Sequence, residues 1–237
     1  AVEADAMAAS RASNAEAPED AASMGWSSAN TRDGAATLLG RIASTSAFDR
    51  LRTKEQLGYM VDAGLDVVSG AVALQCGVQS ATGLDPKGIE ARIEAWTLAL
   101  KEEIADMSQE DIARQARGLS QELLQRPGAL RDVISRDWHE VSTGRRRFSH
   151  VEFRAESLLA VTREDLLKLV DDHLLSSQRR VLRTRVYAAG DDREGGCDDA
   201  SWTVLRTRAA LRAFKEAAVY WPPAVRWDEG AVGSPAD

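Results

Sequence analysis

A change in the spacing of apolar residues between positions 36 and 68 constrains this chain more than any other feature. In the first part, apolar residues recur at intervals of three and four, as on the buried face of a helix: Ala36, Leu39, Ala43, Ala47 and Leu51. After Gly58, the residues Tyr59, Val61, Ala63, Leu65 and Val67 alternate with Met60, Asp62, Gly64 and Asp66, which is typical of a half-buried strand. The sequence therefore predicts a helix over 36–51 and a strand that begins at about Gly58.

A hairpin and a long amphipathic helix are predicted next. Residues 72–79 alternate again after Ser69 and Gly70, so we expect an antiparallel pair with a tight turn. Asp85 is then a predicted N-cap, with Pro86 at the first helical position. The helix that follows carries an apolar stripe of Ile89, Ile93, Trp96, Leu100, Ile104 and Met107. We expect this stripe to cover the sheet, and not a membrane or a partner, because an amphipathic helix beside strands usually packs on them.

The remaining pattern continues as helices, with one further strand. Ser108 and Asp111 open a helix that runs to about residue 125, before the break at Pro127 and Gly128. Thr162 is a predicted N-cap with Asp165 at the capping-box position. The predicted elements are helices at 129–141, 151–159, 163–174 and 202–219, and a strand at 180–188. The fold class is therefore α+β, an antiparallel or mixed sheet covered by helices.

The ends of the chain differ in composition from its middle. Residues 1–34 are rich in Ala and Ser and poor in large apolar groups, so we expect a disordered tail that is neither a secretory signal nor a mitochondrial transit peptide. The main domain is predicted at 35–190. A loop and a helical extension follow at 191–226, and a disordered tail at 227–237. The first residue is Ala, and we expect a fragment, an incomplete gene translation or a shortened relative.

Composition narrows the function classes. A net charge of −7 argues against a nucleic-acid partner, and no apolar run is long enough to span a membrane. The two cysteines, Cys76 and Cys197, form neither a disulfide framework nor a zinc cluster, and Cys76 is expected in the core. They fit a reducing compartment, so we expect a cytoplasmic protein, with mitochondria as the alternative.

Catalytic motifs are missing from the sequence. His139, His150 and His173 do not form His-x-x-Glu-His or its reverse, and neither a phosphate loop nor a nucleophile elbow occurs. The arginine run at 145–147 could bind phosphate or an acidic peptide, but a solvated loop is the favoured interpretation. The chain by itself is therefore not expected to bind catalytic zinc or to hydrolyse peptides.

Arg52 and Tyr59 are the two candidate functional residues. Arg52 lies just before the predicted helix-to-strand corner and Tyr59 just after it. A guanidinium group and a phenol near one corner could both donate hydrogen bonds to a carbonyl oxygen. The alternative is structural, with Arg52 at a helix end and Tyr59 packed at a sheet edge.

Residues 48–59 also carry a family resemblance. Leu-Arg-Thr-Lys-Glu-Gln-Leu-Gly-Tyr at 51–59 is similar to the signature of the C-terminal half of the insulin-degrading enzyme, nardilysin and pitrilysin family of zinc peptidases, the inverzincins. Similarity covers about residues 36–190, with a weaker match at 202–225. It includes Val78–Ser80, Ile89–Glu94, Met107–Asp111, Trp138–Glu140, Phe148 and Leu159–Leu166.

The resemblance implies a LuxS/MPP-like metallopeptidase domain that encloses a peptide substrate together with a zinc-bearing N-terminal half, in the same or a separate chain. It implies that zinc lies in that N-terminal half, and that Arg52 and Tyr59 reach across to hold the substrate near the scissile bond. A homodimer is a further partner that it allows. Two alternatives stay open: a non-catalytic scaffold of the same fold, and a free-standing peptide-binding module that uses an exposed sheet edge.

Overall fold

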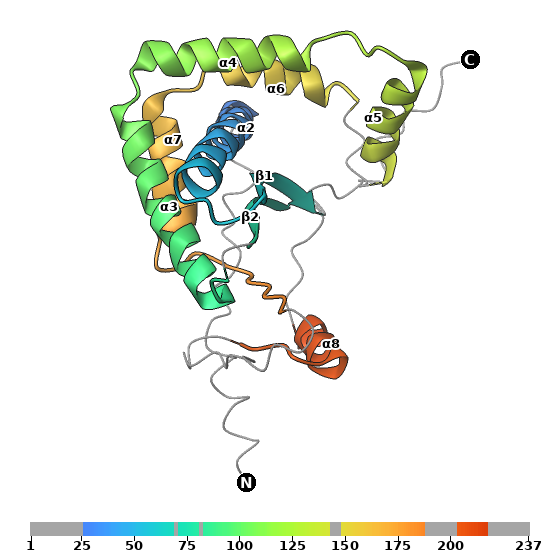
Figure 1. Cartoon of the computed structure of the whole chain (residues 1–237). Helices are drawn as coiled ribbons and strands as arrows, with labels where there is room; N and C mark the ends of the chain where they lie inside the picture. Colours follow the sequence, from blue (N-terminus) through green and yellow to red (C-terminus); the bar gives the residue numbers. More distant parts are fainter. Residues whose placement is uncertain (1–25, 69–70, 81–82, 143–147, 188–202, 218–237) are drawn as a thin grey trace, which may run out of the picture.

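The computed structural model describes residues 26–68, 71–80, 83–142, 148–187 and 203–217. Helices dominate this part of the chain, and one antiparallel hairpin is its sheet (Figure 1). The long helices are α2 (Trp26–Ala47), α3 (Pro86–Asp106), α4 (Gln109–Leu123) and α5 (Leu130–Ser142). The shorter ones are α6 (His150–Leu159), α7 (Arg163–Leu169) and α8 (Arg208–Ala217), with π-helical turns η2 (Phe48–Lys54) and η3 (Val170–Leu175). The strands are β1 (Met60–Val68) and β2 (Ala71–Gln79).

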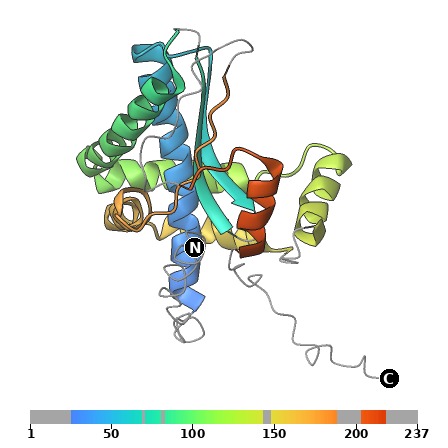
Figure 2. The same ribbon diagram turned by 90° about the horizontal axis from the view of Figure 1, so that it is seen from below.

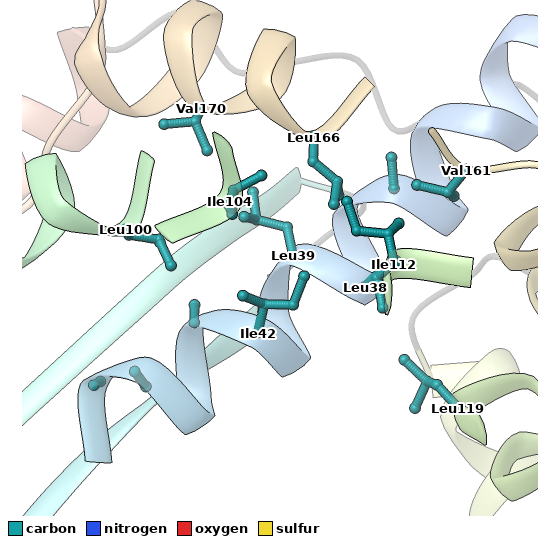
Figure 3. Packing of buried hydrophobic residues seen from close by; sticks show 14 of the residues in the cluster. Leu38, Leu39, Ile42, Leu100, Ile104, Ile112, Leu119, Val161, Leu166 and Val170 are labelled. Atoms are coloured by element: carbon teal, nitrogen blue, oxygen red, sulfur yellow. The ribbon is translucent and has the colours of Figure 1, made fainter. Parts of the chain in front are cut away.

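Helix α2 forms the centre of the core. Its apolar side chains, among them Leu38, Leu39 and Ile42, are buried between residues of α3, α4 and α7 (Figure 3). Of the residues in the predicted spacing, Leu39, Ala43, Ala47 and Leu51 are buried and Ala36 is half-buried. The buried face of α2 lies against several elements at once. Because α2 runs directly into η2, the position of η2 is fixed by this core.

The predicted hairpin is confirmed and packs its apolar face on α2 (Figure 2). Register pairs Met60 with Gln79 and Val68 with Ala71, and the core-facing side carries Ala63, which is buried. Gly40 of α2 permits this contact, since a Cβ there would lie 2.6 Å from the Leu65 side chain. The antiparallel sheet, the covering helices and the fold class agree with the sequence prediction.

Helix α3 buries the central part of the predicted stripe in the core, but the expectation that the stripe covers the sheet is wrong, because α3 packs chiefly on α2, η2, α7 and η3. Trp96, Leu100 and Ile104 are essentially inaccessible to solvent. The indole Nε1 of Trp96 donates to Ser46 Oγ at 3.0 Å, so the buried polar atom of the ring is satisfied by α2. Burying three large side chains on this face explains why α3 packs into the core.

The predicted helix caps are present. Asp85 accepts from the backbone N–H of Gly88 at 2.8 Å, and Ser108 accepts from that of Asp111 at 3.1 Å. Thr162 and Asp165 form a reciprocal capping box at the start of α7. These local hydrogen bonds satisfy N–H groups that a helix start leaves unpaired, so they can be predicted from sequence alone.

The predicted start of the first helix, at residue 36, is wrong. Helix α2 begins at Trp26, ten residues before the expected start, and residues 26–34 belong to the segment expected as a tail. The reason is tertiary: Asp33 pairs with Arg154 of α6 at 3.2 Å. A Cβ on Gly34 would lie 2.6 Å from the backbone of Ser157, so the two helices are in close contact there. Contacts with α6 therefore stabilise helix in a stretch whose composition is poor in apolar residues.

The predicted third strand is also wrong. Residues 180–187 are extended but pair with no strand among the described residues. The alternating arginines form ion pairs with α3. Arg183 contacts both Glu90 and Glu94, and Arg185 contacts Glu90. Arg179 donates to Glu94 at 2.8 and 2.9 Å. The arginines of the alternating pattern thus face α3. We call residues 179–187, which these ion pairs hold against α3, the strap.

The ends of the other strands and helices differ less from their predicted positions. Strand β1 begins at Met60 and not at Gly58, and α8 is shorter than the helix predicted at 202–219. The remaining helices lie within a few residues of their predicted ranges. The predicted turn at 69–70, the loops at 145–147 and 190–200, residue Cys197 and the ends of the chain fall outside the described residues. Within the described part, none of the helices has the length and apolar character needed to cross a bilayer.

Candidate functional site

The candidate site lies where α2 ends and the chain turns into β1. The last turn of this helical segment, η2, has widened π-type geometry, in which Glu55 N–H donates to Arg50 O at 2.9 Å. Single π-helical turns of this kind are frequent at functional sites. Gln56 then adopts a positive φ of 52°, in the left-handed region that residues other than glycine seldom occupy. The corner therefore has a defined shape that carries Arg52 on one side and Tyr59 on the other.

Two buried leucines fix this corner to the core. Leu51 and Leu57 have 0% and 2% of their surface exposed. Gly58 follows in close contact with the end of β2, because a Cβ there would lie 1.9 Å from Gln79 O. These anchors are apolar or backbone groups, so the polar residues of the corner are left to face solvent or partners.

Most charged residues of the corner are paired with one another. Arg50 Nε donates to Glu55 Oε1 at 3.3 Å, and Arg92 of α3 approaches the same carboxylate at 3.8 Å. Lys54 Nζ lies 2.7 Å from Asp49 Oδ2, and this hydrogen-bonded carboxylate raises the pKa of Lys54 above its usual value. Lys54 is exposed and is therefore protonated across the physiological range.

Arg52 differs from these neighbours, because aromatic rings and not carboxylates surround it. Its guanidinium carbon lies 4.5 Å from the centre of the Phe48 ring and 4.8 Å from the centre of the Tyr59 ring. Both distances are within the range of a cation–π contact. Among the described residues, no hydrogen bond or ion pair is formed by the Arg52 side chain.

The structure thus brings the two predicted site residues together. Tyr59 is 79% exposed, although the alternation predicted it on the half-buried face of a strand. The reason is that β1 begins one residue later, at Met60, so Tyr59 belongs to the corner and not to the sheet. Arg52, partly exposed, carries N–H donors, and Tyr59 carries a hydroxyl donor. Chemically, the pair can donate hydrogen bonds to an oxygen that carries partial negative charge.

Sequence reasoning missed Phe48 as a member of this site. Phe48 begins η2 and is 46% exposed, and its ring contacts Arg52 directly. The available signal was its spacing of four from Arg52 in a helical stretch, which places the two side chains on one face.

Metal-binding geometry is not found at this corner or elsewhere in the described part of the chain. No group of three or more His, Cys, Asp or Glu side chains there could hold a metal ion. His150 pairs through Nδ1 with the buried Glu140 at 3.4 Å, in the region of α5 and α6.

Parts of this chain are similar to known proteins. Residues 38–138 match the family described as PQQ synthase PqqF-like, C-terminal lobe domain 4. Insulin-degrading enzyme from Bos taurus is 30% identical over 150 residues, which cover 63% of this chain and 14% of that protein. A zinc protease from Schizosaccharomyces pombe is 33% identical over 135 residues, which cover 56% of this chain and 14% of that protein.

The fold agrees with these sequence matches. The crystal structure of pitrilysin superposes with a TM-score of 0.54 at 23% sequence identity, over 60% of this chain and 15% of the pitrilysin chain. The chain therefore spans about one seventh of the length of the relatives that it matches. The second half of α2, the corner and the hairpin lie inside the range matched by the family, 38–138. Together, these matches support a C-terminal domain like those of the inverzincin family of zinc peptidases.

Proposed function

We propose that this chain is the substrate-binding and chamber-closing part of a zinc metalloendopeptidase similar to insulin-degrading enzyme. In this proposal a separate N-terminal half, in the same or another chain, supplies the zinc ion that activates the attacking water. The chain by itself is not catalytic. Its contribution is a surface at the corner of η2 and β1 that binds the peptide near the scissile bond.

The observation that supports this proposal is that aromatic rings, and not carboxylates, contact the guanidinium group of Arg52. Three other cations around the corner, Arg50, Lys54 and Arg92, contact carboxylates, whereas the guanidinium of Arg52 contacts ring faces. A cation–π contact occupies no carboxylate or carbonyl acceptor, so the strong N–H donors of Arg52 are available to a ligand. A purely structural arginine at a helix end would be expected to bind a carboxylate or a backbone carbonyl.

Arg52 and Tyr59 have complementary roles in the proposed mechanism. A peptide carbonyl gains negative charge on its oxygen when water attacks its carbon. Donors that are already in place stabilise that charge without further reorganisation. The hydroxyl of Tyr59 can donate to this oxygen, while Arg52 can hold a neighbouring backbone carbonyl. The buried anchors Leu51 and Leu57 hold the backbone of the corner that carries both groups.

Reconstitution tests this proposal. The full chain is mixed with a separately produced zinc-bearing N-terminal half, and hydrolysis of a quenched fluorogenic peptide is followed with and without a chelator. We expect chelator-sensitive hydrolysis in the mixture and none with the chain alone. Tyr59→Phe should then lower kcat by about 10²–10³-fold, as for the loss of one oxyanion donor. Arg52→Ala should mainly raise KM, because it removes a substrate contact.

Matched variants separate these effects from general damage. Arg117→Ala removes an exposed arginine from α4, and Tyr187→Phe removes a hydroxyl from the extended strap. Both should leave kcat and KM close to the values of the unmodified chain. Unchanged turnover in Tyr59→Phe would remove the assigned role of that residue, and an inactive mixture of folded partners would contradict the proposed function.

A second candidate function is a peptide-binding module without a catalytic partner. The observation in its favour is the small sheet, in which β1 and β2 pair only with each other among the described residues. Each strand therefore leaves one edge that an extended peptide could join. Peptide binding by the chain alone that is insensitive to Arg52→Ala and Tyr59→Phe would favour this candidate over the first.

A further inference from the structure

We infer that Phe48 is a positioning residue, whose ring fixes the guanidinium group of Arg52 so that its N–H donors are ready for a ligand. The inference deepens the proposed function, on which its relevance to substrate rests. It is carried by geometry: the guanidinium carbon of Arg52 lies 4.5 Å from the centre of the Phe48 ring and 4.8 Å from that of the Tyr59 ring. Both ring contacts act on the one cation of the corner that lacks an ion pair among the described residues.

The two rings are held differently. Phe48 lies in η2, directly after the buried α2, and its backbone carbonyl accepts from Thr53 Oγ1 at 3.3 Å. Tyr59 lies beyond the corner and is 79% exposed, compared with 46% for Phe48. The Phe48 ring is therefore attached to the element that continues the buried helix α2, and it is less exposed than the Tyr59 ring. It provides the reference surface against which Arg52 is ordered, while Tyr59 is free to contact a ligand through its hydroxyl.

An aromatic ring is better suited than a carboxylate to order the side chain of Arg52. An arginine side chain has several rotatable bonds and loses considerable rotamer entropy when it binds a ligand from a disordered state. A carboxylate would order the side chain but would also occupy its donors. The face of an aromatic ring attracts the cation and leaves the donors available, so it orders Arg52 without competing with a substrate.

A role of Phe48 in the core is a weaker explanation. The side chain is about half exposed and is not a member of the buried cluster that surrounds α2. Phe153 of α6 is 50% exposed and gives a matched control for the loss of a partly exposed ring. Replacement of either residue should therefore leave the chain folded, and differences between the two variants report on Arg52.

The first test is NMR spectroscopy of the full chain. The Nε–Hε signal of Arg52 should be displaced by ring currents in the unmodified protein. Phe48→Leu should move this signal toward the position of an unstacked arginine, whereas Phe48→Tyr should retain it and Phe153→Leu should not change it. A signal of Arg52 that is the same in Phe48→Leu and the unmodified chain would overturn the inference. Circular dichroism verifies that each variant is folded.

The second test uses the reconstituted mixture and the quenched fluorogenic peptide. Phe48→Leu should raise KM roughly two- to fivefold with little change in kcat, the effect expected for loss of one exposed cation–π contact. Phe48→Tyr should restore KM, and an unchanged KM in Phe48→Leu would overturn the positioning role. An inactive mixture with the unmodified chain would instead refute the proposed function, and the NMR comparison alone would then decide whether Phe48 fixes Arg52.

Discussion

Replacing Gly58 by alanine should disturb the corner that carries the candidate site. A Cβ at this position would lie 1.9 Å from Gln79 O and 2.8 Å from Gln79 C, both backbone atoms at the end of β2. Real Cβ contacts do not fall below 3.0 Å, so the gap between the corner and β2 has to widen by about 1.1 Å. The clash cannot be relieved by rotating a side chain, because the obstructing atoms belong to the backbone.

The expected cost follows from two opposing effects. Overpacking of this kind typically destabilises a protein by about 1–3 kcal/mol. Alanine also restricts the unfolded chain, which offsets about 0.4–1 kcal/mol where the native backbone conformation suits it. The free energy of unfolding of Gly58→Ala should therefore fall by up to about 2.6 kcal/mol, and by about 1.3 kcal/mol at the middle of both ranges. For a chain of this size each kcal/mol corresponds to about 2–4 °C in Tm.

Gly64→Ala is the matched control within β1. A Cβ at Gly64 would meet no atom within 4 Å, so only the effect on the unfolded chain remains. Urea denaturation of both variants, followed by circular dichroism, measures the difference directly. Because Tyr59 follows Gly58, the Gly58→Ala variant should also weaken peptide binding in the reconstituted mixture. Equal stability of the two alanine variants would refute the claim that the corner is packed against β2.

Three further perturbations have defined outcomes. Trp96→Phe removes buried volume and the hydrogen bond to Ser46, and should lower the free energy of unfolding, measured in urea, by about 1–3 kcal/mol. Glu94→Gln should accelerate amide hydrogen exchange over residues 180–187, because two arginine contacts of the strap lose their charged acceptor; exchange unchanged from that of the unmodified chain would contradict this role. Burial raises the pKa of Cys76 to about 12, so its alkylation at pH 8 should be slow in the folded chain and fast in urea, as mass spectrometry of the modified peptides can show. Since the pKa is raised on folding, the stability contributed by this neutral thiol is present below pH 9 and is lost as pH rises toward 12.

Local rules were sufficient for most of the secondary structure. The caps at Asp85, Ser108 and Thr162 depend on hydrogen bonds across three residues, and all three are present. The stripe of α3 and the alternation of the hairpin likewise report which face is buried, because the spacing of apolar residues follows from helix and strand geometry. Fold class was predictable for the same reason.

Nonlocal contacts explain where the structure differs from the sequence prediction. Residues 180–187 alternate like a strand, yet no neighbouring strand among the described residues pairs with them, and carboxylates of α3 bind their arginines. Helix α2 begins ten residues early because α6 lies against Gly34, which no pattern within the segment reveals. A period in the sequence shows which side chains share a face, but it does not show what covers that face.

The candidate site, too, was predictable from the sequence only in part. By itself, the sequence determined that Arg52 and Tyr59 flank a helix-to-strand corner, since the change of period and Gly58 are both local features. The tertiary structure alone decided that both residues meet, that Tyr59 is exposed, and that Phe48 completes the contact. The physical reason is that a cation–π contact depends on the distance between a guanidinium group and a ring. That distance is set by the widened turn, the positive φ of Gln56 and the packing of Gly58 on β2.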